Sequence, residues 1–249
     1  MQSGYTDHFL GAPEKEYYVK IAGLQKLTLL DFPERVACTV FTAGCNFRCP
    51  FCHNAELVLG HIGEEFMSEE EFFKFLSKRQ GILDGVAITG GEPLLQPGID
   101  TFLERIKELG FQTKLDHNGS RPEILKDLIE RKLVDYVAVD IKNCKEKYPL
   151  TAGCSWSFLS KVEETVELLK QGLVPYEFRT TVVKELHEKE DFESIGEWIK
   201  GADKYFLQQF EDSGELIEEG WSAASKEEMQ SFLETVRPYV KYAALRGVK

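Results

Sequence analysis

Short apolar runs rich in β-branched residues alternate with longer amphipathic segments along most of the chain. Each run predicts a buried strand, because the strands of a parallel sheet are covered on both faces and are almost continuously apolar. The predicted strands are residues 35–42, 85–89, 111–115, 134–141, 176–183, 205–209 and 240–245. Two further strands, 18–22 and 26–30, are predicted to form a short hairpin around Gly23.

Apolar positions three and four residues apart predict amphipathic helices between these strands. Three Ser-x-x-Glu sequences, which begin at Ser68, Ser120 and Ser225, have the spacing of a capping box and mark helix starts. The helix after Ser120 has Pro122 in its first turn, and the helix after Ser225 is ended by Pro238. The helix after Ser68 is predicted to span residues 68–78. Three further helices are predicted at residues 99–109, 157–170 and 191–200.

This alternation of strands and helices is typical of βαβ units. It continues without a Pro/Ser-rich linker or a change of composition, so residues 18–249 are predicted to form one α/β domain with a parallel sheet. Residues 1–17 are polar and are interpreted as an N-terminal arm. Periodicity alone leaves open whether the sheet is open and doubly wound or forms a full or partial barrel.

The composition is that of a globular protein, with 43% hydrophobic residues, and it excludes a disordered chain. The 249 residues carry 30 Lys and Arg against 42 Asp and Glu, a formal net charge of −12. This balance argues against nucleic acid as a partner, because phosphate binding requires clustered basic residues. The chain has no signal-peptide pattern and no apolar run of membrane-spanning length, so we expect a cytoplasmic protein with reduced thiols and no membrane partner.

The cysteines are the candidate metal-binding residues. Cys45, Cys49 and Cys52 directly follow the first buried parallel strand, and parallel α/β folds place their sites at such strand ends. Their thiolates suit zinc or an iron–sulfur cluster. A zinc site would need a fourth ligand, which His53 provides only awkwardly, whereas three cysteines on a [4Fe–4S] cluster leave one iron open for a ligand. Zinc remains the weaker alternative. The other cysteines are expected only to pack: Cys38, Cys144 and Cys154.

The spacing Cys-x3-Cys-x2-Cys, with Phe51 before the last cysteine, resembles the cluster motif of the radical S-adenosylmethionine (SAM) enzymes. Residues 90–93 (Gly-Gly-Glu-Pro) follow the second buried strand, which is where that family has its motif for the SAM amino group. The resemblance extends from about Leu24 onward. It implies a partial (β/α)6 TIM barrel of the radical SAM type.

Other segments resemble the glycyl-radical-enzyme activating enzymes within that family. Residues 27–36 and 41–58 look like the long form of the anaerobic ribonucleoside-triphosphate reductase activating protein, and they are similar to pyruvate formate-lyase activating enzyme. Residues 116–119 match the group's Asp-Thr-Asn-Gly, with His117 in place of Thr. Residues 140–142 (Asp-Ile-Lys) match its Asp-Leu-Lys.

The resemblance implies a role for these positions. Cys45, Cys49 and Cys52 would hold one [4Fe–4S] cluster, and the amino and carboxylate groups of SAM would bind its open iron. The reduced cluster would cleave SAM into methionine and a 5′-deoxyadenosyl radical. The residues expected to bind SAM are Phe51, Gly90, Gly91, Glu92, Asn118, Asp140, Lys142 and Arg179.

Three finer expectations concern the edges of this site. Glu92 is expected to accept a hydrogen bond from the ammonium group of SAM. Asp116 and Asp140 end neighbouring strands, and the resemblance places a monovalent cation near them. The family's late adenine-contacting histidine is absent, so Gln208 or Gln209 is expected to take its place.

The resemblance implies an oxygen-sensitive enzyme that installs a glycyl radical on a partner such as anaerobic ribonucleotide reductase. Flavodoxin or ferredoxin would donate the electron. Two alternatives stay open. One is a radical SAM enzyme that acts on a small molecule, like 7-carboxy-7-deazaguanine synthase. The other is a zinc or electron-transfer module without enzymatic activity, which the Gly-Gly-Glu-Pro motif and the pair Asp140 and Lys142 disfavour.

Overall fold

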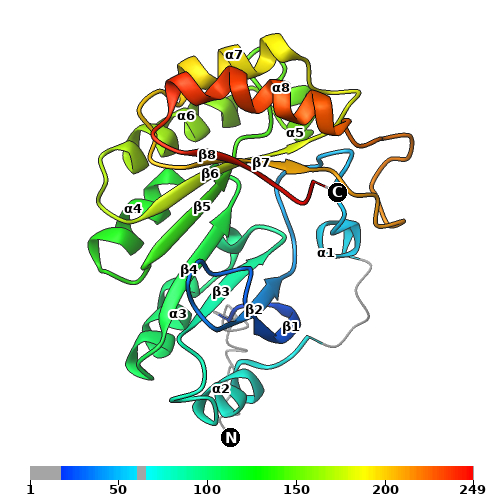
Figure 1. Cartoon of the computed structure of the whole chain (residues 1–249). Coiled ribbons are helices and arrows are strands. Elements are labelled where there is room, and N and C mark those ends of the chain that lie inside the picture. Colours follow the sequence, from blue (N-terminus) through cyan, green and yellow to red (C-terminus); the bar gives the residue numbers. More distant parts are fainter. Residues whose placement is uncertain (1–17, 61–65, 249) are drawn as a thin grey trace, which may run out of the picture.

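The computed structural model describes residues 18–60 and 66–248, so the predicted arm at residues 1–17 lies outside the described residues. The strands form one sheet in chain order, in which β1 is antiparallel to β2 and every later pair of neighbours is parallel (Figure 1). They are β1 (Ile21–Thr28), β2 (Ala37–Thr42), β3 (Gly85–Gly90), β4 (Gln112–His117), β5 (Tyr136–Asp140), β6 (Tyr176–Val182), β7 (Tyr205–Gln209) and β8 (Ala243–Arg246).

The curved sheet is an incomplete barrel (Figure 1). Within the described ranges β1 and β8 are its two ends and are not paired with each other. The predicted α/β class, the parallel sheet and the partial barrel are therefore confirmed. The sheet contains an antiparallel β1 at one end and a further parallel strand, β8, at the other.

Helices cover the convex face of this sheet (Figure 1). Their apolar sides are buried against the strands, as in α3, where Ile99, Phe102, Leu103 and Ile106 are almost fully inaccessible to solvent. The long helices are α2 (Glu69–Ser77), α3 (Ile99–Glu108), α4 (Pro122–Glu130), α6 (Ser157–Lys170), α7 (Lys189–Trp198) and α8 (Lys226–Val236). None of the helices within residues 18–60 and 66–248 has the length and apolar character needed to cross a membrane.

Four short helical segments were not predicted, because so few residues cannot show a helical period. They are α1 (Ala55–Leu59), α5 (Tyr148–Ala152) and the 3₁₀ turns η1 (Pro93–Leu95) and η2 (Arg237–Tyr239). Two of them matter for the site, because α1 directly follows the cysteine loop and α5 packs against it.

Two of the three predicted capping boxes are confirmed. Ser68 and Ser225 each accept a hydrogen bond from the backbone N–H of the glutamate three residues later, and that glutamate bonds back. The prediction for Ser120 is wrong, because α4 begins at Pro122 with Arg121 as its N-cap residue. Ser120 is buried, and its hydroxyl accepts a hydrogen bond from the side-chain amide of Asn46 instead.

The predicted hairpin around Gly23 is also wrong. Residues 21–28 form one continuous strand that pairs with β2, and Gly23 lies opposite Phe41 at an irregularity in the register. A glycine inside a strand therefore marks a bulge here rather than a turn. Pairing with a distant strand outweighs the local turn preference of glycine.

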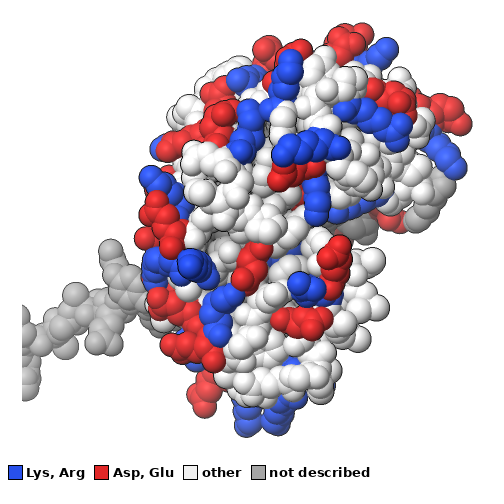
Figure 2. Space-filling model, turned by 60° about the vertical axis from the view of Figure 1, so that its left-hand side comes forward, with Lys and Arg blue, Asp and Glu red and all other residues white. Residues whose placement is uncertain are grey.

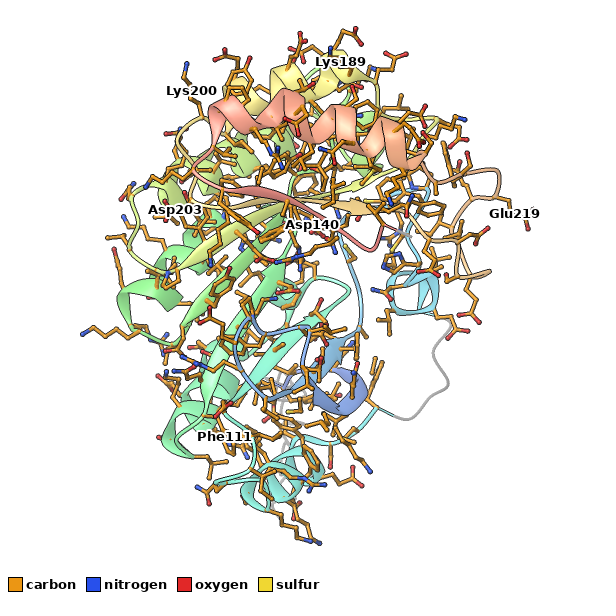
Figure 3. All side chains as sticks on the ribbon, in the orientation of Figure 1. Phe111, Asp140, Lys189, Lys200, Asp203 and Glu219 are labelled. Carbon is orange, nitrogen blue, oxygen red and sulfur yellow. The ribbon has the colours of Figure 1, made fainter. Side chains whose placement is uncertain are left out.

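The concave face of the sheet carries charged side chains. Asp140, at the end of β5, lies inside the curve of the sheet, whereas Lys189 and Lys200 lie at the outer surface formed by α7 (Figure 3). On the outer face that Figure 2 shows, acidic and basic side chains are interspersed and do not form a basic stripe. Charged side chains thus occur both on the outer surface and on the concave side, and those on the concave side, such as Asp140, are partly enclosed by the sheet.

Candidate functional site

Cys45, Cys49 and Cys52 line one cavity of about 430 Å³ at the carboxyl ends of the parallel strands. This volume lies in the usual range for small-molecule sites. The predicted residues that line the same cavity are Phe51, Gly90, Gly91, Asp116, Asn118, Asp140, Lys142, Arg179 and Gln208. The structure thus brings together side chains from the cysteine loop and from the ends of several strands. Glu92 and Gln209 are the predicted residues that do not line this cavity.

Two distant segments hold the cysteine loop in place. The backbone N–H of Arg48 donates to the carbonyl oxygens of Ala152 and Gly153, at 3.1 and 3.2 Å. On the other side of the loop, the N–H of Glu218 donates to the carbonyl oxygen of Pro50 at 2.8 Å. The cavity wall therefore depends on the chain after β5 and on the loop after β7.

The two glycines of the Gly-Gly-Glu-Pro motif lie directly against the cysteine loop. A Cβ atom on Gly91 would lie 2.0 Å from the carbonyl oxygen of Gly44, and one on Gly90 would lie 2.4 Å from the backbone nitrogen of Thr42. Gly90 also has a φ of 110°, which other residues rarely adopt. In the structure, these glycines permit a close approach between two loops, and their predicted contact with SAM stays a prediction.

Glu92 is buried beneath the cavity and is 1% exposed. One of its carboxylate oxygens accepts the backbone N–H of Leu94 at 2.9 Å, and the other accepts the N–H of Asn118 at 2.8 Å. Burial raises the pKa of Glu92 to about 7, although these two hydrogen bonds favour the ionised form. Glu92 thus joins the loops after β3 and β4, and its predicted contact with the ammonium of SAM stays a prediction.

Replacing Glu92 with glutamine is expected to change how stability depends on pH. Because folding raises the pKa of Glu92 from 4.5 to about 7, its contribution to stability is full below about pH 4.5 and is lost as the pH rises through 7. Chemical unfolding at pH 5 and pH 8 measures the difference between wild type and Glu92→Gln. The free energy of unfolding of the wild type, relative to that of Glu92→Gln, should be about 1–3 kcal/mol higher at pH 5 than at pH 8. An equal difference between the two proteins at both pH values would contradict this.

Asn118 connects Glu92 to the cysteine loop through a ring of hydrogen bonds. Its side-chain amide donates to the Oδ1 atom of Asn46 at 2.9 Å and points toward the sulfur of Cys45 at 3.8 Å. Its own Oδ1 atom accepts the backbone N–H of Ser120 at 2.9 Å. Asn118 was predicted to bind SAM, whereas this role of Asn46 and Ser120 was missed, because their contacts join segments that are distant in sequence.

A row of opposite charges crosses the cavity floor. Arg179 donates from Nη1 to Asp116 at 2.9 Å and from Nε to Asp140 at 3.0 Å. Lys142 pairs with Asp140 at 3.0 Å, and Lys114 pairs with Asp116. Burial alone would raise the pKa of both carboxyls, but these cations outweigh it and hold the pKa of Asp116 and Asp140 below their usual range.

The thiols and their arrangement fit an iron–sulfur cluster. Burial raises the pKa of Cys45 to about 11 and that of Cys49 to about 12, so metal binding must release their protons. A closed zinc site needs four ligands, whereas three thiolates on a [4Fe–4S] cluster leave one iron open for a further ligand. Three thiolates that line one cavity therefore suit a cluster whose open iron can take a ligand in that cavity.

Aromatic and amide side chains complete the cavity. Phe51 is 4% exposed, and its ring packs edge-on against Phe210 at 6.5 Å. Of the two glutamines predicted to replace a histidine, Gln208 lines the cavity, whereas the side chain of Gln209 donates to the carbonyl oxygen of Ala224 outside it. Of the two, only Gln208 is therefore placed to contact the adenine of SAM, and this contact stays a prediction.

His117, which stands in place of a threonine in the resemblance, also lines the cavity. Its Nδ1 atom accepts the backbone N–H of Gly119 at 3.1 Å. Burial lowers the pKa of His117 to about 4, so the ring is neutral at physiological pH and carries its proton on Nε2.

The three other cysteines have no place in the cavity wall. Cys38 is fully buried within β2, as predicted. The thiol of Cys144 is buried and donates to Asp191 at 3.3 Å, so this cysteine has a polar partner that the sequence did not indicate. Cys154 is partly buried against the core.

Gly153 is a further residue that sequence reasoning missed. It ends α5 with a φ of 57°, and a Cβ atom there would lie 2.0 Å from the carbonyl oxygen of Arg48. The only signal available was a glycine between the predicted strand 134–141 and the predicted helix 157–170, which is too common to single out a position. The close approach becomes visible only when α5 is packed against the cysteine loop.

Replacing Gly153 with alanine is expected to destabilise the protein by about 2–4 kcal/mol, because the strained φ and the clash with Arg48 add together. Gly172→Ala is the matched control. Gly172 also has a positive φ of 72°, but nothing lies within 4 Å of its added Cβ. Chemical denaturation should give a smaller loss for Gly172→Ala, about 1–2 kcal/mol, and equal losses would show that the contact with the loop costs nothing.

Comparisons with known proteins agree with this geometry. The family described as the Radical SAM superfamily matches residues 39–199. The chain is 36% identical over 203 residues to "Putative glycyl-radical enzyme activating enzyme MJ1227" of Methanocaldococcus jannaschii, which covers 80% of this chain and 83% of that protein. It is 29% identical over 150 residues to 7-carboxy-7-deazaguanine synthase of Thermococcus kodakarensis, which covers 52% of this chain and 57% of that enzyme.

A solved structure supports the fold alone. A domain of pyruvate-formate lyase-activating enzyme from Bacteroides vulgatus superposes with a TM-score of 0.54 at 17% identity, covering 66% of this chain and 99% of that chain. Family match, relatives and fold therefore lead to the same assignment as the cysteine loop and the Gly-Gly-Glu-Pro motif. The chain belongs to the radical SAM superfamily, in the branch of the glycyl-radical enzyme activating enzymes.

Proposed function

We propose that this protein holds one [4Fe–4S] cluster on Cys45, Cys49 and Cys52 and cleaves SAM. The observation that carries the proposal is that these thiols share one cavity with most of the predicted SAM-binding residues. When bound, the cluster would supply the electron that cleaves the sulfonium bond of SAM into methionine and a 5′-deoxyadenosyl radical.

The residues of the cavity would each serve the binding of SAM. Lys142 and Arg179 provide positive charge for its carboxylate, because both line the cavity and are 16% and 13% exposed. Phe51 and Gln208 would contact the adenine, since they offer an aromatic face and an amide group at the cavity wall. Asn118 would donate a hydrogen bond to the sulfur of Cys45 and hold the cluster loop.

We further propose that the radical is passed to a glycine of a partner protein, in the manner of a glycyl-radical enzyme activating enzyme. The relative from Methanocaldococcus jannaschii supports this, because its similarity spans most of both chains. Anaerobic ribonucleotide reductase is the partner proposed, and flavodoxin or ferredoxin the electron donor. A small-molecule reaction like that of 7-carboxy-7-deazaguanine synthase is the second candidate, supported by the shorter match to that enzyme.

One experiment tests the proposal in two stages. The protein is reconstituted without oxygen, and iron, sulfide and 5′-deoxyadenosine are measured after reduction with SAM present. A content of about one zinc per chain with no cleavage of SAM would refute both candidate functions, the activating enzyme and the small-molecule radical SAM enzyme. If SAM is cleaved, electron spin resonance on a mixture with anaerobic ribonucleotide reductase should detect a glycyl radical, which is lost when the glycine of the reductase is replaced. Cleavage that requires a deazapurine precursor, with no protein radical, would favour the second candidate.

Leu30 provides a test of where the partner binds. It is 90% exposed within the activase-like segment 27–36 and precedes Asp31, which lines the cavity. Leu30→Asp is expected to lower partner activation about tenfold or more, because a bound partner would bury the new carboxylate without a pairing charge. Cleavage of SAM without partner should stay within about twofold.

Leu173→Asp is the matched control for Leu30→Asp. Leu173 is 59% exposed but precedes β6, at the end of the strands away from the cavity. The rate of glycyl radical formation should be unaffected by Leu173→Asp. Equal loss in both variants would place the partner elsewhere.

A further inference from the structure

The two aspartates predicted to hold a monovalent cation are already paired with cationic side chains of this chain. Asp116 and Asp140 have four carboxylate oxygens, and each oxygen pairs with a cationic nitrogen of the chain. Arg179 takes one oxygen from each aspartate, Lys142 takes the other oxygen of Asp140, and Lys114 takes the other oxygen of Asp116. The site is therefore a closed network of ion pairs.

Charge balance leads to the same result. Lys114, Lys142 and Arg179 carry three positive charges against two negative charges on Asp116 and Asp140, a net charge of 3 − 2 = +1. Glu177 near Arg179 is itself paired with Arg246 and adds no net charge, whereas the buried Glu92 near Lys142 adds a further acidic group. A metal cation would therefore enter a group in which cationic side chains already balance both aspartates, and it would be repelled by them in a partly buried site.

Metal ligation would also require ion pairs to break. Sodium and potassium are bound by several oxygen atoms at once, as is usual for hard cations. Asp116, Asp140 and Arg179 are 11%, 29% and 13% exposed, so a displaced guanidinium would lose both partners in a partly dry site. The residues present do not fit a monovalent cation.

We propose that the guanidinium group of Arg179 replaces the monovalent metal ion in this protein. It neutralises the two aspartates at the carboxyl ends of β4 and β5, and it holds these strand ends together from β6. Arg179 and Lys142 also line the cavity, so their positive charge is available to an anionic group of the ligand. The statement about the ion stands on geometry alone, whereas the identity of that ligand rests on the proposed function.

Thermal unfolding of the metal-free protein tests the first part. The melting temperature is measured in sodium, potassium and tetramethylammonium chloride at equal ionic strength, so that only specific binding separates the salts. We expect the three values to agree within about 1 °C, because a bound ion would stabilise the folded state by mass action. A melting temperature that rises in a saturable way with sodium or potassium overturns the proposal.

Arg179→Met gives the converse result and distinguishes a resident cation from a merely structural residue. The variant leaves Asp116 and Asp140 short of one positive charge and opens oxygens on both. Its melting temperature should become about 2–4 °C higher in potassium or sodium than in tetramethylammonium. Arg179→Lys retains the charge and should show little of this dependence. Equal destabilisation of Arg179→Met in all three salts would overturn the proposal.

Two further measurements keep the inference testable if Arg179→Met does not fold. Relaxation of the sodium-23 resonance in the presence of wild-type protein should equal that in buffer, and line broadening that potassium reverses would overturn the proposal. With the reconstituted protein, the dissociation constant of SAM should be the same in potassium and in tetramethylammonium. A tenfold tighter binding in potassium would contradict the inference, whereas a failure of SAM to bind in any salt would count against the proposed function alone.

Discussion

Cys49→Ala is expected to abolish cluster assembly and to lower the formation of 5′-deoxyadenosine by at least about 100-fold. Residues that merely support metal ligands affect metal sites by roughly 10–100-fold, and loss of a ligand itself should exceed that range. Cys49 is the most enclosed of the three thiols, being 7% exposed, with its sulfur 3.5 Å from the carbonyl oxygen of Ala152. Besides Cys45 and Cys52, which are needed as ligands themselves, no cysteine lines the cavity and could replace it.

The effect is measured as iron and sulfide per chain, the visible absorption of the cluster and the rate of SAM cleavage under reduction. Cys154→Ala is the matched control. Cys154 is partly buried close to the same loop, since it follows Gly153, but it does not line the cavity. This control should bind iron and cleave SAM as the wild type does. A Cys49→Ala protein with a full cluster and normal cleavage would refute the assignment of the cysteine loop.

Gly91→Ala is expected to destabilise the protein by about 3 kcal/mol and to displace the cysteine loop. The added Cβ would lie 2.0 Å from the carbonyl oxygen of Gly44, and this neighbour is backbone that cannot rotate away. The hydrogen bonds from Gly91 to Thr42 and from Glu92 to Gly44, at 2.8 and 2.7 Å, connect the two loops at this point. Relief of the clash must therefore move the wall that carries the thiols.

Gly23→Ala is the control for the loss of glycine alone. A Cβ on Gly23 would lie 3.5 Å from the side chain of Phe41, an ordinary contact, and neither Gly23 nor Gly91 has a positive φ. Chemical denaturation should show a change within about 1 kcal/mol for Gly23→Ala. The fraction of chains that take up a cluster should fall for Gly91→Ala and remain normal for Gly23→Ala. Equal stability of the two variants would mean that the loops have room to separate.

Local signals were reliable where the responsible contacts are also local. The capping boxes at Ser68 and Ser225 involve residues three positions apart, so the sequence contains the whole interaction. Ser120 has the same spacing but not the same role, because Asn46 and Asn118 bring it into a buried network. Gly23 likewise has the sequence environment of a turn, and its pairing with the distant strand β2 places it inside a strand.

In the candidate site, too, features that depend on neighbouring residues could be predicted, and features that depend on distant residues could not. The cysteine spacing lies within one loop, so three ligands and their place after a buried strand could be predicted without coordinates. The prediction of a cation at Asp116 and Asp140 assumed two unpaired carboxylates. Arg179 is far from both in sequence, and only the parallel register of β4, β5 and β6 brings it between them.

The sequence by itself determined the alternation of strands and helices and the parallel α/β class, and its motifs indicated the family and the candidate cluster ligands. These features depend on residue periodicity and on short motifs, which are properties of neighbouring positions. Only the tertiary structure decided that Glu92 is buried beneath the cavity, that Gly91 and Gly153 admit the cysteine loop, and that Arg179 neutralises two aspartates. Each of these depends on atoms that are distant in sequence and meet through packing, where a difference of one methyl group or one charge determines the outcome.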